Sequence, residues 1–310
     1  MPPPRAPASR ASESPAATPS PSSRPQTTLA AGLYVVATPI GNLEDITLRA
    51  LRVLKEADLI ACEDTRQTQK LLNHYGITTR SVSYHEHNEM RRTAELIVDL
   101  ERGLRLALVT DAGMPGISDP GFRLISLAVR HGVPVIPIPG ASAFLAALVG
   151  SGLPTDSFRF SGFLPAKRSQ RRAVLESIRE SPRTQIFYEA PHRIREVLED
   201  IVHVLGGARH VVIAREVTKM HEEFLRGRAD ELLDIARTRE LKGEITMLIA
   251  KAEELPEGAT EPATPPGVRL RMQELMAAEA LDEKSALKRV AREMGISKSE
   301  AYREFQRSKS

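Results

Sequence analysis

Three loops rich in small residues are the parts of this chain best suited to bind a ligand. They span residues 38–45, 111–121 and 139–143, and each follows an apolar run typical of a buried strand. Glycine lets a ligand approach the backbone, and helices expected after the loops offer N–H donors that suit a carboxylate. Any one loop could simply be a shaped connection. Three at the same edge of a sheet predict a ligand cleft, because ligands bind at the carboxyl ends of parallel strands.

The residues around these loops disfavour several other kinds of chemistry. The sequence has neither the phosphate loop of nucleoside triphosphatases nor the Gly-x-Gly-x-x-Gly fingerprint of dinucleotide enzymes. His85 and His87 alternate after a strand-like run, but no companion set of Cys or His completes a metal site, so none is predicted. Cys62 follows Leu-Ile-Ala, which favours a buried, inert thiol over a nucleophile.

Alternating strands and helices must position the three loops. Up to residue 152, short apolar runs alternate with amphipathic stretches, a pattern typical of an α/β domain with a mostly parallel sheet. Asp64 is expected to cap the second helix, and Ser118 or Asp119 a later one with Pro120 in its first turn. Strands are expected at 33–37, 59–62, 81–84, 106–109 and 133–136, and helices at 47–56, 65–75, 88–101, after 119 and from 142.

The chain changes character after Gly152. Strands close together in sequence, with helices between some of them, predict a second α+β domain whose sheet is partly antiparallel. Strands are expected at 158–163, 184–188, 209–216, 222–226 and 244–250, and helices at 169–180, 194–205 and 229–238. The predicted division is a disordered Pro/Ser-rich tail (1–30), an α/β domain (31–152), an α+β domain (153–255), a linker (256–266) and a helical segment (267–310).

Composition says little about partners but something about the compartment. The formal net charge is +3, and the excess lies in the tail and the C-terminal segment, so local basic patches would have to hold any nucleic acid. No apolar stretch approaches the ~20 residues of a membrane helix, and no secretory signal begins the chain. With one cysteine, these features predict a cytoplasmic protein.

An ordered series of motifs from about Leu33 to Ala252 resembles the ribosomal RNA small subunit methyltransferase I family of the tetrapyrrole methylase superfamily. The motifs are Tyr34-Val35-Val36-Ala37-Thr38-Pro39-Ile40-Gly41-Asn42-Leu43, Glu63-Asp64-Thr65-Arg66, His85-Glu86-His87-Asn88-Glu89, Asp111-Ala112-Gly113, Ser118-Asp119-Pro120-Gly121, Phe163-Leu164-Pro165, Phe187-Tyr188-Glu189, His192-Arg193 and Lys242-Gly243-Glu244. Two residues depart from the family pattern: Met114 stands where Thr is usual, and Ala141 where Pro is common.

The resemblance implies a fold, an activity and partners. It implies two α/β domains that hold S-adenosyl-L-methionine between them, usually in a homodimer. It also implies methylation of the 2′-oxygen of a cytidine in the decoding region of 16S rRNA, within the 30S subunit. The residues implied in cofactor binding are Pro39, Gly41, Asp111, Ala112, Gly113, Ser118, Pro139, Gly140 and Ser142.

A ribose hydroxyl is a weak acid, so its methylation calls for a nearby proton acceptor. Glu63 is the preferred candidate base, since Asp64 has the competing role of capping a helix. Further catalytic candidates are Arg66, which is better suited to hold a carboxylate or phosphate, and His85 and Lys242.

Basic residues outside the loops are candidates for RNA contact. Residues 167–172 form the densest basic patch before the linker, although a solvated helix start would look the same. Arg193 is a further candidate that could instead form a structural ion pair with Glu189. The predicted RNA-binding residues are Lys167, Arg168, Arg171, Arg172 and Arg193. The C-terminal helices resemble a helix-turn-helix, but simple helical packing explains them equally well.

Two other functions stay open. A carbon methyltransferase of corrin or porphyrin rings would use the same fold, although the basic patch and the helical appendage weigh against it. A non-catalytic RNA-binding protein of ribosome assembly would bind RNA without affinity for S-adenosylmethionine.

Overall fold

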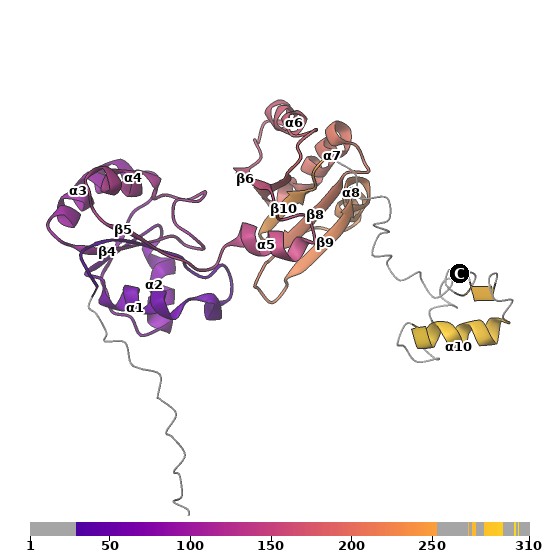
Figure 1. The fold of residues 1–310 in the computed structure, drawn as a ribbon, viewed down its shortest axis with the longest axis horizontal. Coiled ribbons are helices and arrows are strands. Elements are labelled where there is room, and N and C mark those ends of the chain that lie inside the picture. The colour runs from indigo at the N-terminus through magenta and orange to yellow at the C-terminus, as the bar shows by residue number, and fades with distance from the viewer. Residues whose placement is uncertain are drawn as a thin grey trace, which may run out of the picture. The chain divides into compact units, whose positions relative to one another are not determined.

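The computed structural model describes residues 29–252, 272, 275–276, 282–293, 301 and 303 (Figure 1). The chain divides into two compact units, Met1–Lys251 and Ala252–Ser310. Both predicted sheets lie in the first unit. Nearly all of the predicted tail, and the whole predicted linker at 256–266, lie outside the described residues.

The first sheet is parallel throughout and has the strand order β3-β2-β4-β1-β5. Its strands are β1 (Gly32–Val36), β2 (Leu59–Cys62), β3 (Ser81–Ser83), β4 (Arg105–Val109) and β5 (Val135–Ile138). The prediction of a mostly parallel first sheet is therefore confirmed. Because β1 lies between β4 and β5, the loops that leave these three strands are neighbours at one edge of the sheet.

Two pairs of helices cover the two faces of this sheet (Figure 1). They are α1 (Leu48–Glu56) with α2 (Thr65–His74), and α3 (Glu89–Glu101) with α4 (Phe122–Arg130). Successive strand residues point to opposite faces. In β1, Tyr34 and Val36 pack with the α1–α2 layer, whereas Leu33 and Val35 pack with α3 and α4.

Helix α4 begins later than the sequence predicts. It starts at Phe122 with Gly121 at its N-cap, so the prediction that Ser118 or Asp119 caps it is wrong. Ser118 has a left-handed backbone (φ 63°), and the Gly116 N–H donates to the Pro120 carbonyl at 3.2 Å. These contacts close residues 116–121 into a separate turn ahead of the helix.

The second sheet is mixed and has the order β6-β7-β10-β8-β9. Its strands are β6 (Phe158–Phe163), β7 (Thr184–Glu189), β8 (His210–Arg215), β9 (Glu223–Arg228) and β10 (Ile245–Ile249). Only the β6–β7 pairing is parallel, which confirms that part of this sheet is antiparallel. One face packs against α6 (Arg168–Ser177), α7 (Ile194–Leu205) and α8 (Ala229–Thr238).

Helix α5 (Ala143–Ser151) covers the other face of the second sheet. Its Ala147 and Leu148 pack with Ile186 and Leu248 of that sheet, and Ile40 from the loop after β1 joins the same cluster. The helix that follows the third loop is thus part of the second sheet's core. This packing brings residues of the second sheet close to the loops of the first.

In the second unit, helix α10 (Glu283–Glu293) lies within the predicted helical segment (267–310) and buries Leu287, Val290 and Ala291. Most of the rest of that predicted segment lies outside the described residues. None of the helices in the described part of the chain is both long and apolar enough to cross a membrane.

Candidate functional site

The first two loops are joined by a short antiparallel bridge. The Thr38 N–H donates to the Gly113 carbonyl (2.9 Å), and the Gly113 N–H donates to the Thr38 carbonyl (3.0 Å). Gly113 has a φ of 81°, a conformation that glycine adopts readily. The bridge fixes the ends of β1 and β4 at a set spacing.

The third loop packs directly against the first. A Cβ on Gly140 would lie 2.8 Å from the Cβ of Ala37. On its other side, Ala141 has its carbonyl oxygen 3.8 Å from where a Cβ on Gly113 would stand. The three loops therefore converge at one edge of the first sheet, and the missing Cβ of Gly140 lets the third loop approach the end of β1.

A cavity of about 420 Å³ lies where the loops meet residues of the second sheet. This volume is in the usual range for small-molecule sites. Aromatic rings form part of its wall, since Tyr188 packs edge-on against both Phe160 and Phe163. We call this space the loop cavity. Its lining is Ile40, Ala112, Met114, Ile117, Ser118, Asp119, Ser142, Ala143, Phe144, Phe163, Tyr188, Glu189, Ala190, Pro191, Val217, Gly243, Glu244, Ile245 and Thr246.

The predicted ligand-binding residues divide into two groups. Ala112, Ser118 and Ser142 line the loop cavity, as does Met114, one of the two departures from the family pattern. The others shape the loops without appearing in its lining: Pro39, Gly41, Asp111, Gly113, Pro139 and Gly140.

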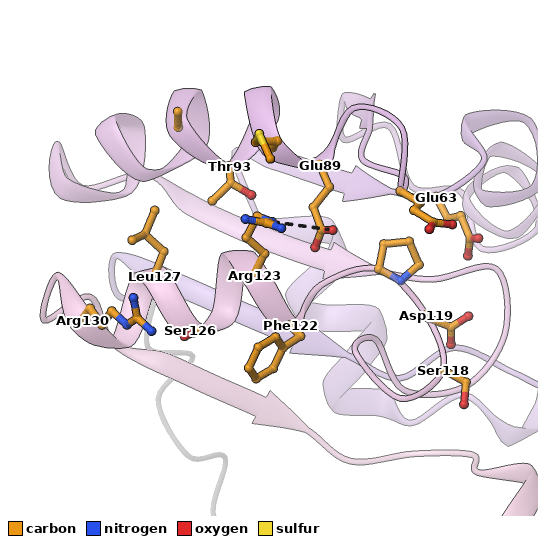
Figure 2. A pocket seen from close by; sticks show the side chains of 14 residues that line it. Glu63, Glu89, Thr93, Ser118, Asp119, Phe122, Arg123, Ser126, Leu127 and Arg130 are labelled. Carbon is orange, nitrogen blue, oxygen red and sulfur yellow. Dashed lines mark ion pairs between the residues drawn. The ribbon is translucent and has the colours of Figure 1, made fainter. Parts of the chain in front are cut away.

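A second, larger hollow of about 790 Å³ lies between α3 and α4 (Figure 2). We call it the α3–α4 groove. Glu63, Ser118 and Asp119 lie toward one end, and Leu127 and Arg130 toward the other (Figure 2). The middle of the groove holds an ion pair between Arg123 and Glu89 (4.0 Å) and the exposed ring of Phe122. Phe122 is 74% exposed, which is unusual for an aromatic residue.

Carboxylates gather where the groove meets the sheet edge. The Thr110 hydroxyl donates to Glu63 Oε2 (2.9 Å), and the Asp64 N–H donates to Asp111 Oδ1 (3.1 Å). Burial and the neighbouring charge of Glu63 raise the pKa of Asp119 to about 6. Burial also raises the pKa of Asp111, whereas Arg66 lowers that of Asp64. Asp119 therefore exchanges its proton close to neutral pH.

Of the predicted catalytic residues, Glu63 alone lines either hollow. Arg66 is 88% exposed and paired with Asp64 at 2.9 Å. His85 Nε2 lies 3.2 Å from the Asn88 amide nitrogen, and its Nδ1 is buried without a partner. Lys242 points to Glu240 (3.2 Å) and is mostly exposed. The structure does not bring these three side chains to the loop cavity.

The predicted basic patch proves to be organised around one buried carboxylate. Arg168, Arg171 and Arg172 all bind Asp200, at 2.9, 2.8 and 2.7 Å respectively. Arg171 is 1% exposed, so its guanidinium holds the fold together and is closed to RNA. Lys167 is exposed. Lys167, Arg168 and Arg172 are thus the accessible part of the patch.

Arg193 also makes contacts that hold the fold together. Its guanidinium donates to the carbonyls of Leu164 and Pro165, both at 3.0 Å, and lies 3.4 Å from Glu189. The ion-pair alternative for Arg193 and Glu189 therefore matches the geometry. These bonds tie the start of α7 to the segment after β6.

The contact between the β8–β9 turn and the first loop is a feature that the sequence did not reveal. Glu216 and Thr218 have left-handed backbones (φ 52° and 70°), and Lys219 binds Glu216 (2.8 Å) and Glu244 (3.2 Å). A Cβ on Gly41 would overlap the Lys219 side chain, so Gly41 is the contact point between the first loop and this turn. The strands predicted at 209–216 and 222–226 implied a turn here but not its contact with Gly41, because that contact is tertiary.

Within the described residues, no three His, Cys, Asp or Glu side chains are placed to hold a metal ion. Cys62 is buried, and burial raises the pKa of its thiol, as expected of an inert cysteine.

Comparison with known proteins adds to this geometry. Residues 32–233 match the family described as Tetrapyrrole (Corrin/Porphyrin) Methylases. A Halalkalibacterium halodurans protein named Ribosomal RNA small subunit methyltransferase I is 50% identical over 276 residues, covering 87% of this chain and 93% of that protein. A Synechocystis protein of the same name is 45% identical over 272 residues, covering 87% and 95%. A crystal structure of diphthine synthase is similar in fold alone, with a TM-score of 0.55 at 19% identity, over 70% of this chain and 89% of that one.

Proposed function

Because this chain belongs to the ribosomal RNA small subunit methyltransferase I family of the tetrapyrrole methylases, we propose that it methylates 16S rRNA with S-adenosyl-L-methionine as donor. The acceptor in this proposal is the ribose 2′-oxygen of a cytidine in the decoding region. The observation that carries the proposal is the loop cavity, where three glycine-bearing loops converge beside the second sheet.

The residues of the loop cavity suit such a donor. Ala112, Ser118 and Ser142 are small and leave room near the backbone. The donor is a sulfonium cation, and the carboxylate of Glu244 is in the lining to favour its charge.

S-adenosylmethionine, when bound, supplies a methyl group that a nucleophilic oxygen can displace from sulfur. The protein then has to hold the acceptor hydroxyl in line with that methyl group, keep water out and receive a proton. Positioning of this kind can lower a barrier by ~7–11 kcal/mol in favourable cases. The fixed spacing of the Thr38–Gly113 bridge supports it, because a rigid loop pair holds its ligand in one place.

The remaining parts of the proposal concern partners. Lys167, Arg168 and Arg172 are proposed to contact phosphates of the 30S subunit's rRNA, which would take place in the cytoplasm. We also propose that the protein acts as a homodimer, as the family resemblance implies.

The activity can be tested with isotope-labelled donor and 30S subunits from a strain that lacks the modification. We expect one ribose methylation, located by mass spectrometry of nuclease fragments. Subunits that stay unlabelled under conditions where the donor binds would overturn the proposal.

Two further measurements separate the alternatives. Calorimetry should show binding of S-adenosylmethionine, and RNA binding without donor binding would instead indicate a non-catalytic assembly protein. Tight binding of a uroporphyrin-type ring, with its carbon methylated, would indicate a tetrapyrrole enzyme.

A further inference from the structure

We propose that Asp119 is the catalytic base that receives the proton of the acceptor hydroxyl, at the junction of the loop cavity and the α3–α4 groove. This inference rests on the proposed function and assigns the proton transfer to a residue other than Glu63. It also makes the α3–α4 groove the route by which the RNA reaches the donor.

The position of Asp119 between the two hollows is the main reason. Ser118 and Asp119 are the two residues that line both the loop cavity and the α3–α4 groove. If the donor occupies the loop cavity and the RNA enters by the groove, the methyl group must cross where the two spaces meet. Of this pair only the carboxylate of Asp119 can hold a proton reversibly near neutral pH, because a serine hydroxyl ionises far above it.

The other carboxylates nearby are less suitable. Glu63 lines the groove but not the loop cavity, and its Oε2 already accepts a hydrogen bond from Thr110 at 2.9 Å. Asp111 lines neither hollow and accepts the N–H of Asp64 at 3.1 Å. Neither Glu63 nor Asp111 lines both hollows, and their charges act on Asp119 from a distance.

A closed turn holds Asp119 in place. The Gly116 N–H bonds to the Pro120 carbonyl at 3.2 Å, and Ser118 between them is held in a left-handed conformation. A Cβ on Gly121 would lie 3.1 Å from Leu108 and 3.3 Å from the Gly116 nitrogen, so the turn is packed tightly onto β4. A left-handed conformation in a non-glycine residue persists because the surrounding contacts hold it.

The charges that face Asp119 adjust its proton affinity for this role. Glu63 at the end of β2 and Asp111 after β4 reinforce the effect of burial, and the nearby Thr110 hydroxyl partly offsets it. Tyr188 of β7 and Glu244 before β10 lie in the same cavity lining, and Glu89 of α3 and Arg123 of α4 line the groove. The resulting pKa of about 6 leaves Asp119 ionised, yet basic enough to accept a proton, at neutral pH.

The step balances without any further reactant. The acceptor oxygen forms a bond to the methyl carbon while the bond from that carbon to the sulfonium sulfur breaks and leaves its electron pair on sulfur. The hydroxyl proton passes to the Asp119 carboxylate and then to solvent. One sulfonium cation, one hydroxyl and one carboxylate are consumed, and a thioether, a methyl ether and a carboxylic acid are formed.

The first test is Asp119→Asn, assayed for single-turnover methyl transfer to 30S subunits and for donor affinity by calorimetry. We expect the rate to fall by about 10²- to 10⁴-fold with donor affinity within about threefold of the parent. The parent's rate should rise with pH up to about 6 and then level, since the base must be ionised, and the variant should lose this rise.

Asp99→Asn on the exposed side of α3 is the matched control and should keep both rate and profile. A variant within tenfold of the parent rate, or one that keeps the rise, would overturn the inference.

A second variant, and a measurement that needs no catalysis, distinguish loss of the base from a folding defect. Glu63→Gln removes a charge that raises the pKa of Asp119, so it should move the rise to lower pH and lower the plateau by less than tenfold. In ligand-free protein, ¹³C NMR of aspartate carboxyls should show one resonance titrating near pH 6 that is missing in Asp119→Asn and shifted in Glu63→Gln. No such resonance, or a rate lost in Glu63→Gln and kept in Asp119→Asn, would assign the base to another group. A parent that binds donor but never labels RNA would instead overturn the proposed function itself.

Discussion

The Asp119 side chain is poorly suited to be an anion in the folded protein, and this should be measurable as stability. Burial and the charge of Glu63 give it a folded pKa of about 6, above the ordinary 3.8. A carboxylate with a raised folded pKa binds more protons folded than unfolded, so its contribution to stability falls as pH rises from about 4 to about 6. The full shift corresponds to about 3 kcal/mol, and partial exposure reduces this to about 1.

Asp119→Asn should therefore be more stable than the parent by about 1 kcal/mol at pH 8, with most of the gain absent at pH 4. Urea unfolding of both proteins at the two pH values measures this. A stabilised but inactive variant is the pattern expected when a site is kept for function at a cost in stability. The same stability difference at both pH values would contradict a raised pKa.

A substitution that adds one Cβ at Gly140 tests how closely the loops must pack. In Gly140→Ala the new Cβ would stand 2.8 Å from the Cβ of Ala37, so one loop must shift. We expect donor affinity to fall about tenfold, or ~1.4 kcal/mol. The double variant Ala37→Gly/Gly140→Ala removes the colliding atom and should recover most of the affinity by calorimetry. Single and double variants with equal affinity would show that this contact does not shape the cavity.

At the scale of elements, Asp200 on α7 holds α6 in place. Its side chain is 0% exposed and binds three arginines, one of them the buried Arg171. Although burial opposes ionisation, these arginines keep the pKa of Asp200 below its ordinary value. Its stabilising effect is therefore present above about pH 4 and is lost as pH falls through the lowered pKa.

Asp200→Asn should lower the free energy of unfolding by about 3–5 kcal/mol, because it leaves a buried guanidinium without its counter-charge. The control is Glu176→Gln, which removes an exposed 2.7 Å pair with Arg179 and should change the free energy of unfolding far less than Asp200→Asn does. Thermal or urea unfolding at pH 7 compares the two. Equal losses would mean that the α6–α7 contact does not depend on this cluster.

The elements were largely predictable because their apolar periodicity is local. The bounds of β2, β6, α7 and α8 agree with those predicted from the sequence. The start of α4 was not predictable, since Ser-Asp-Pro is also a favoured helix start. Only the packing of Gly121 against Leu108 and Gly116 reveals the separate turn.

The sequence predicted which loops form the site, but it did not predict which side chains line it. Small residues after three apolar strands predicted the convergence, which the placement of β1 between β4 and β5 brings about. The α3–α4 groove depends on how two helices pack, which no local pattern encodes. The burial of Arg171 likewise depends on Asp200, 29 residues away in the chain.

Because the whole molecule has a small net charge, RNA binding depends on where its Lys and Arg side chains are exposed. The chain's formal charge is +3, and the structure neutralises part of the α6 patch with Asp200. Lys167 and Arg168 remain exposed at the start of α6, Arg168 with 60% of its side chain accessible. An RNA held at this surface would release counterions in proportion to these contacts.

The double variant Lys167→Ala/Arg168→Ala should weaken binding to small-subunit rRNA and flatten its salt dependence. Each lost phosphate contact reduces the slope of log affinity against log salt by about 0.7–0.9, so the pair should reduce it by about 1.5. Donor affinity should not change, because neither residue lines the loop cavity. Lys55→Ala/Lys70→Ala, on α1 and α2, removes the same charge elsewhere and should leave the slope unaltered. Filter binding from about 50 to 200 mM salt measures all three proteins. Equal slopes for the two double variants would place the RNA on another surface, since total charge alone would then account for both.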